Sequence, residues 1–170
     1  MQLAPARPPL RTIILWMILA SVLYGASYQQ FRMVTVLPNM DVGGLSDSIS
    51  YLAMSHGNYD VSPARRYRPV IPWLASLVQK VLAYNIKDSD QRDKLSFYLV
   101  NFIFSLATAV LLQGIFGRIG FKWELQLLGS ILFLTSRINV MSVGSPMVDS
   151  LYFFAIAVIV YLILCEQVTY

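Results

Sequence analysis

Four apolar stretches of membrane-spanning length constrain this chain more than any other feature of its sequence. The first predicted span, 12–32, opens with about 20 uncharged residues, and at ~1.5 Å of rise per residue a helix of that length crosses the ~30 Å hydrocarbon core of a bilayer. Three more spans are predicted at 95–117, 123–143 and 148–165. A cleaved signal peptide is the alternative for the first stretch, although its apolar part exceeds the usual ~7–15 residues. The sequence therefore predicts an all-α integral membrane protein with about four transmembrane helices.

The composition favours the same class of protein. Apolar residues make up 56% of the chain and charged residues 13%, and the charged share is about half that of a soluble domain. The chain has 13 Lys+Arg and 9 Asp+Glu, for a net charge of +4. In a membrane protein this excess indicates topology and contact with anionic lipids, and it argues against a nucleic-acid partner. A single cysteine, Cys165, and a single histidine, His56, nearly exclude a zinc site of the usual kind.

A long polar loop, 34–94, separates the first two predicted spans and is expected to contain helices near 46–56 and 70–86. Lys80 interrupts the second of these after about 11 uncharged residues, which is too few to cross a bilayer. Its apolar residues share one helical face, with Ala75, Ser76, Gln79 and Lys80 on the other side: Val70, Ile71, Leu74, Leu77, Val78, Val81 and Leu82. The pattern predicts a juxtamembrane amphipathic helix that lies in the membrane interface, with a fifth span as the alternative.

Basic residues near the membrane ends predict the orientation. Arg7 and Arg11 favour a cytoplasmic N-terminus, because short cytoplasmic segments carry an excess of Lys and Arg. Four spans then place the C-terminus in the cytoplasm and the loop 34–94 outside. The seven basic residues in the second half of that loop conflict with an outside position, but loops of this length largely escape the rule. With four spans Asp47 and Asp149 face the same compartment, and a fifth span would separate them.

Asp47 is the first candidate for a catalytic acid. Ser46 is a predicted N-cap, and Asp47 then stands in the first helical turn, where the helix dipole stabilises a carboxylate. Tyr51 lies four residues later on the same face. The alternative is that Asp47 is simply an acid at the start of a helix.

Three short motifs occur in the loop and before the last span. They are Asp47-x-x-x-Tyr51-Leu52-Ala53, Arg66-Tyr67-Arg68-Pro69-Val70-Ile71-Pro72-Trp73 and Pro146-Met147-Val148-Asp149. Together they resemble the N-terminal part of the GT-C superfamily of membrane glycosyltransferases. In that family a first span leads into a long extracytoplasmic loop with a catalytic Asp, and a sugar moves from a polyprenyl-phosphate carrier to a lipid, protein or glycan. The resemblance implies that Asp47 matches the loop acid and Asp149 the second acid.

The chemistry that this resemblance implies needs a base and a site for phosphate. Asp47 is expected to be the general base on the acceptor hydroxyl, or to hold a divalent cation that neutralises the leaving phosphate. Tyr51 shares its helical face and is expected to contact the substrate. Arg65, Arg66 and Arg68 precede the interfacial helix, and arginine forks suit phosphate oxygens. The alternative for these arginines is ordinary binding to anionic lipid headgroups.

Arg137 lies about twelve residues into the third predicted span, where a charge is expensive in lipid. We expect it to contact a phosphate or to pair with Asp149, with Asn139 as a second polar neighbour. The alternative is a snorkelling side chain near the outer interface.

The expected protein is a GT-C-like glycosyltransferase of the bacterial inner membrane, or part of one. Family members usually have more membrane helices, and Ser48 stands where many relatives carry Glu. The chain is therefore expected to be a fragment, half of a split enzyme, or a subunit that lacks the activity. The alternative function is a non-catalytic membrane subunit that scaffolds a larger complex, with a second membrane subunit as its partner.

Overall fold

The computed structural model describes residues 10–36 and 46–167, and in this part of the chain all the regular structure is helical. The helices are α1 (Leu10–Val36), α2 (Ser46–Ser55), α3 (Pro63–Arg66), α4 (Val70–Leu82), α5 (Ser89–Arg118), α6 (Trp123–Thr135), α7 (Arg137–Gly144) and α8 (Asp149–Gln167). The all-α prediction is confirmed for these residues. Residues 1–9, 37–45 and 168–170 lie outside the described part of the chain. Arg7, which supports the predicted orientation, and the positions 37–45 of the predicted loop are therefore not described.

Helices long enough to cross a membrane dominate the fold. Three segments qualify by length and apolarity: Thr12–Val34 in α1, Ser89–Arg118 in α5 and Asp149–Glu166 in α8. The pair α6–α7 supplies a fourth if it is counted as one bent span. The prediction of about four spans therefore agrees with the structure, and the described helices are compatible with a multi-pass membrane protein.

The third predicted span, 123–143, is broken rather than straight. α6 and α7 meet at an angle of 55°, and Ser136 between them has an extended backbone with ψ of 141°. Its hydroxyl donates to the carbonyl of Phe133 at 2.8 Å and lies 3.4 Å from the backbone N–H of Asn139, which it caps. These two bonds end α6 and start α7. The serine side chain satisfies a carbonyl at the end of α6 and an N–H at the start of α7, which would otherwise lack partners at the break.

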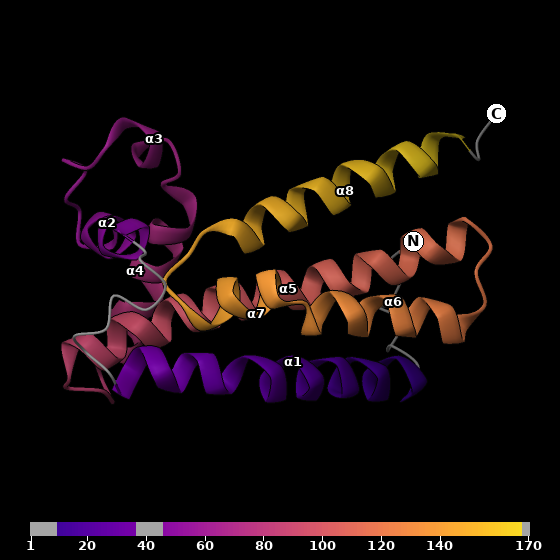
Figure 1. Cartoon of the computed structure of the whole chain (residues 1–170), viewed down its shortest axis with the longest axis horizontal. Coiled ribbons are helices and arrows are strands. Elements are labelled where there is room, and N and C mark those ends of the chain that lie inside the picture. The colour runs from indigo at the N-terminus through magenta and orange to yellow at the C-terminus, as the bar shows by residue number, and fades with distance from the viewer. Residues whose placement is uncertain (1–9, 37–45, 168–170) are drawn as a thin grey trace, which may run out of the picture.

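The connections between the long helices alternate between two ends of the molecule. The start of α1, the α5–α6 turn and the end of α8 lie at one end, and the short helices α2, α3 and α4 lie at the other (Figure 1). Asp47 of α2 and Asp149 of α8 therefore lie at the same end of the long helices. The compartment that this end faces stays a prediction.

A hydrophobic core joins α2 and α4 to α5 and to the residue that precedes α8. Its buried members are Tyr51 and Met54 of α2, Ile71 and Ala75 of α4, Phe97 and Val100 of α5, and Val148. Each large side chain buried here stabilises the fold by about 1.5–3 kcal/mol if its alternative is water. This core fixes where α2 and α4 stand relative to α8.

The face that α4 buries differs from the predicted one. Ala75 and Gln79, which the pattern placed on the polar side, are 0% and 8% exposed, and Gln79 Nε2 donates to Ser55 Oγ at 3.1 Å. Ile71 is buried with them. Other residues of the predicted apolar face are exposed: Val70, Leu77 and Val81. α4 thus has one apolar face that packs against protein and a second that is exposed. The spacing of apolar residues in the sequence does not distinguish the two faces.

The long helices approach one another closely at two glycines. A Cβ on Gly144 of α7 would stand 2.5 Å from Gln30 of α1, and one on Gly129 of α6 would stand 2.4 Å from Phe116 of α5. Inside a bilayer the hydrophobic effect does not drive helices together, so close packing at small residues takes over that role. These contacts hold the bent pair between α1 and α5.

Cysteine labelling tests the arrangement of the two ends. Asn85→Cys and Glu124→Cys both occupy exposed positions, the first beside the short helices and the second at the opposite end of α5. In a Cys165→Ala background, an impermeant maleimide should reach the two cysteines from opposite sides of the membrane. Replacing Glu124 should leave the topology unchanged, because acidic residues contribute little to it. Reaction of both cysteines from one side would overturn the four-crossing arrangement.

Candidate functional site

The candidate site lies where α2, the α3–α4 turn and the start of α8 meet. α2 supplies Asp47 and Tyr51, the turn supplies Arg68, and α8 supplies Asp149 in its first turn. Four of the residues predicted from the sequence are therefore brought together at one end of the long helices. We call these four residues the acid–arginine cluster.

Arg68 links Tyr51 of α2 to the first turn of α8. Its Nη1 donates to the phenol oxygen of Tyr51 at 3.3 Å, and its guanidinium carbon lies 5.4 Å from the centre of the Tyr152 ring. The hydrogen bond to Tyr51 is the largest of the effects that raise the pKa of Arg68, and the Asp149 carboxylate adds to it. Arg68 is thus a fixed cation between α2 and α8, with donors left over because one guanidinium carries five N–H groups.

Tyr51 is fully buried beneath this arginine. Burial raises the pKa of Tyr51 above its ordinary value, and the carboxylates of Asp47 and Asp149 raise it further, while the hydrogen bond from Arg68 opposes them. Both acids therefore act on one phenol. Tyr51 stays protonated at neutral pH, and its O–H can donate while its oxygen accepts from Arg68.

Asp47 forms an ion pair with a different arginine. Arg65 Nη2 lies 2.6 Å from Asp47 Oδ1, and the two side chains are 26% and 35% exposed. Arg65 Nη1 also donates to Ser50 Oγ at 3.3 Å. A partly exposed pair of this kind contributes only about 0.2–1 kcal/mol to stability. Its main effect is to fix the Asp47 carboxylate at the edge of the acid–arginine cluster.

The start of α8 is held by a buried asparagine that the sequence analysis missed. Asn101 Nδ2 of α5 donates to the carbonyl of Met147 at 3.0 Å, and the hydroxyl of Ser150 donates to Asn101 Oδ1. These bonds flank Asp149 in the chain and therefore fix its position. The sequence did contain a signal for this contact: Asn101 is a polar residue inside an uncharged predicted span, and buried polar groups in membranes need hydrogen-bond partners. Tyr152 was missed too, although it follows Asp149 by one helical turn.

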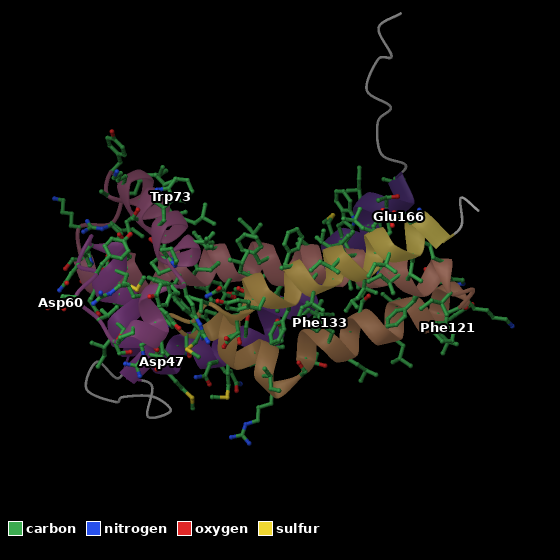
Figure 2. All side chains as sticks on the ribbon, turned by 90° about the horizontal axis from the view of Figure 1, so that it is seen from above. Asp47, Asp60, Trp73, Phe121, Phe133 and Glu166 are labelled. Carbon is green, nitrogen blue, oxygen red and sulfur yellow. The ribbon has the colours of Figure 1, made fainter. Side chains whose placement is uncertain are left out.

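Two of the predicted phosphate-binding arginines, Arg65 and Arg66, are not part of the acid–arginine cluster, and Arg65 pairs with Asp47 as described above. Arg66 donates to the carbonyl of Val61 at 3.2 Å and stands 3.9 Å from Asp60, whose side chain is fully exposed. Figure 2 shows Asp60 at the outer edge of the short helices, apart from Asp47. The three arginines therefore contact different partners: Arg65 contacts Asp47, Arg66 contacts the carbonyl of Val61, and Arg68 contacts Tyr51.

Arg137 departs from its predicted pairing. It is the exposed first residue of α7, and no ion pair joins it to Asp149 within the described residues. Asn139 is not its neighbour in a polar pair either, since Asn139 is buried and accepts from Ser105 at 2.8 Å. The expected Arg137–Asp149 pair was wrong because the break at Ser136 turns Arg137 outward, which agrees with the snorkelling alternative.

A divalent cation would find two protein carboxylates here. In the described part of the chain no group of three His, Cys, Asp or Glu side chains gathers in one place. Asp47 and Asp149 could hold Mg²⁺ only with further oxygens from substrate phosphate and water, which is how Mg²⁺ is commonly bound. A cation here would therefore need oxygens that the described part of the chain does not supply, such as those of a substrate phosphate.

Comparison of the chain with protein-family models, with curated proteins and with solved structures found no match. The resemblance to GT-C enzymes therefore stays a prediction that rests on the three sequence motifs.

Alkaline titration tests the burial of Tyr51. Because its pKa is raised in the folded protein, the stability that the neutral phenol contributes is complete below about pH 10 and is lost as pH rises further. Tyr51→Phe has no phenol to ionise, so its melting temperature relative to wild type should rise between about pH 8 and about pH 11. Tyr84→Phe, at a position 90% exposed, is the matched control and should show no such trend. A Tyr51→Phe difference that stays constant with pH would contradict the assignment.

Proposed function

We propose that the protein is a GT-C-like membrane glycosyltransferase, or part of one, that uses a polyprenyl-phosphate-linked sugar at the extracytoplasmic face. The observation that carries the proposal is that Arg68 donates to the buried phenol of Tyr51 and faces the ring of Tyr152 in the first turn of α8. That turn begins with Asp149, and Asp47 lies one turn before Tyr51 in α2. Two acids and a phosphate-binding cation at a membrane surface are the groups that this chemistry requires.

Arg68 is the proposed ligand of the carrier phosphate. One of its N–H groups is used by Tyr51, and the remaining donors can form a fork to two phosphate oxygens. The ring of Tyr152 below the guanidinium and the hydrogen bond to Tyr51 limit its motion. A cation that is positioned in advance stabilises the negative charge that develops on the leaving phosphate.

Asp149 is the better placed of the two acids to act as base. Asp47 has one oxygen occupied by Arg65 at 2.6 Å, whereas no ion pair within 4.0 Å engages Asp149 in the described part of the chain. In the proposed step a carboxylate takes the proton of the acceptor hydroxyl, the acceptor oxygen bonds to the sugar C1, and the C1–O bond to phosphate breaks. The released phosphate carries the negative charge toward Arg68. Asp47 would then hold a cation or orient the acceptor.

A non-catalytic subunit is the second candidate, and α8 favours it. Only 11% of the apolar segment of α8 is buried, compared with 44% of that of α5. Lipid or the helices of another membrane subunit would cover the rest. In this function the acid–arginine cluster would serve assembly, and substitutions in it would leave transfer unchanged.

Farnesyl phosphate, a short polyprenyl phosphate, is the probe that tests the carrier site. Arg68→Gln should raise its Kd about tenfold or more, since a lost charged hydrogen bond costs about 1.5–3 kcal/mol, and Arg68→Lys should restore part of the affinity. Arg66→Gln, two residues away and turned elsewhere, should bind as wild type does. In a transfer assay with all partner subunits present, Asp149→Asn should bind the probe normally but lose about 10²–10⁴-fold in rate.

Two results would contradict the proposal. Equal weakening by Arg66→Gln and Arg68→Gln would leave only general attraction of an anion to surface charge. Unchanged transfer by both Asp47→Asn and Asp149→Asn, in protein of normal yield, would favour the scaffold.

A further inference from the structure

A second group of polar side chains lies on another side of the short helices. A pocket of about 380 Å³ is lined by Ser55, His56, Ser76, Gln79, Lys80 and Arg92, which come from the end of α2, from α4 and from the start of α5. We call it the basic pocket. In Figure 2, Trp73 of α4 and Asp47 of α2 lie on opposite sides of the short helices, so α4 presents a surface apart from the acid–arginine cluster.

We propose that the basic pocket binds the headgroup phosphate of an anionic phospholipid, whose acyl chains lie along the exposed apolar side of α4. This site is separate from the one proposed for the carrier, and neither proposal depends on the other.

The charges of the basic pocket are the first support. Neighbouring cations have acidic partners: Arg65 pairs with Asp47 and Lys94 with Asp90, each at 2.6 Å. Lys80 and Arg92 form no ion pair within the described residues. Two unmatched cations on one pocket attract an anion, and a membrane surface supplies anionic headgroups at high local concentration.

One acid, Asp93, is bonded to a residue that lines the basic pocket, and a single carboxylate offsets at most one of the two cations. Asp93 is 9% exposed, and its Oδ2 lies 2.6 Å from Nε2 of His56. The carboxylate is therefore turned into the protein and engaged by the imidazole. Ser55 and Gln79 are also fixed, since Gln79 Nε2 donates to Ser55 Oγ at 3.1 Å. Three lining residues of the basic pocket, Ser55, His56 and Gln79, are thus held by hydrogen bonds within the protein, which lowers the entropic cost of binding.

The apolar side of α4 is the second support. Its exposed members recur every three or four residues, and Tyr84 just after the helix continues their spacing. Together they form one stripe, the α4 stripe: Val70, Trp73, Leu77, Val81 and Tyr84. Trp73 and Lys80 are seven residues apart, which is two helical turns, so they lie on the same side of the helix. The cation thus borders the apolar surface. A phospholipid has the matching arrangement, because its phosphate and its acyl chains are attached to the same glycerol.

The aromatic residues of the α4 stripe indicate a membrane and not a soluble partner. Trp73 is 55% exposed and Tyr84 is 90% exposed, and both residue types concentrate at headgroup level in membrane proteins. α4 also lies at one end of the long helices (Figure 1), where the headgroups of a bilayer around them would be. A free phosphate would use the basic pocket but not the α4 stripe, and this difference decides between the two sources.

Lipid binding to the purified full chain in neutral detergent tests the proposal. The probes are dioctanoyl phosphatidylglycerol, dioctanoyl phosphatidylcholine and inorganic phosphate, and binding is measured by thermophoresis. Wild type should bind the phosphatidylglycerol more tightly than the other two. Lys80→Gln with Arg92→Gln should weaken that binding roughly 30-fold, because each cation near a surface contributes about fivefold. Val81→Asn should weaken it as well.

Matched variants keep the test specific. Arg32→Gln with Lys87→Gln removes the same charge from exposed positions outside the basic pocket and should leave phosphatidylglycerol binding unchanged. Arg68→Gln should also leave it unchanged, whereas the Lys80 and Arg92 variant should still bind farnesyl phosphate. All variants should match wild type in size-exclusion profile.

Three outcomes would overturn the proposal. The first is equal phosphatidylglycerol binding by wild type and the Lys80 and Arg92 variant. The second is inorganic phosphate binding as tightly as the lipid, which would make this a site for a soluble anion. The third is equal loss in the Arg32 and Lys87 variant, which would leave only general surface charge.

Discussion

The side-chain amide of Asn101 joins α5 to the segment that leads into α8. It donates to the carbonyl of Met147 and accepts from the hydroxyl of Ser150, so one residue satisfies the backbone and side-chain groups at the start of α8. Among apolar helices such groups find no water, and each must be paired within the protein. Because Asp149 stands between the two bonded residues, this polar contact sets the position of the acid. The acid–arginine cluster then forms where the core below α2 brings Tyr51 to the same place.

Arg68 gives that arrangement its electrostatic character. It lies between a buried phenol and the first turn of α8, bonds to Tyr51 and faces the ring of Tyr152. The neighbouring Arg65 is taken up by Asp47. One arginine of the three thus bridges Tyr51 and the first turn of α8. Arg65 pairs with Asp47, and Arg66 donates to the carbonyl of Val61. The basic pocket on α4 uses separate cations, Lys80 and Arg92, so the same end of the protein presents two charged sites with different surroundings.

The sequence was sufficient for the helical class and for three or four candidate spans, because uncharged length is the quantity that a bilayer selects. It also named Asp47, Tyr51, Arg68 and Asp149 as site residues, but together with Arg65, Arg66 and Arg137. Of these three, Arg65 pairs with Asp47 alone among the four, Arg66 lies near Asp60, and Arg137 is the first residue of α7. Other features depended on tertiary contacts. The break at Ser136 follows from two local hydrogen bonds within an otherwise apolar run, and it turned Arg137 away from Asp149. On α4, Ala75 and Gln79 face protein, because α2 and α5 cover that side, and periodicity does not say what covers a face.

A double-mutant cycle between Arg68 and Asp149 tests most directly whether the α3–α4 turn and α8 share one electrostatic site. The free energy of unfolding is measured for wild type, Arg68→Gln, Asp149→Asn and the double variant. We expect a coupling energy of about 0.5 kcal/mol or more, the scale seen for residues in one network, and additive effects for Arg66→Gln with Asp149→Asn. Additive effects of Arg68→Gln and Asp149→Asn on the free energy of unfolding would contradict the claim that these two residues share one electrostatic site.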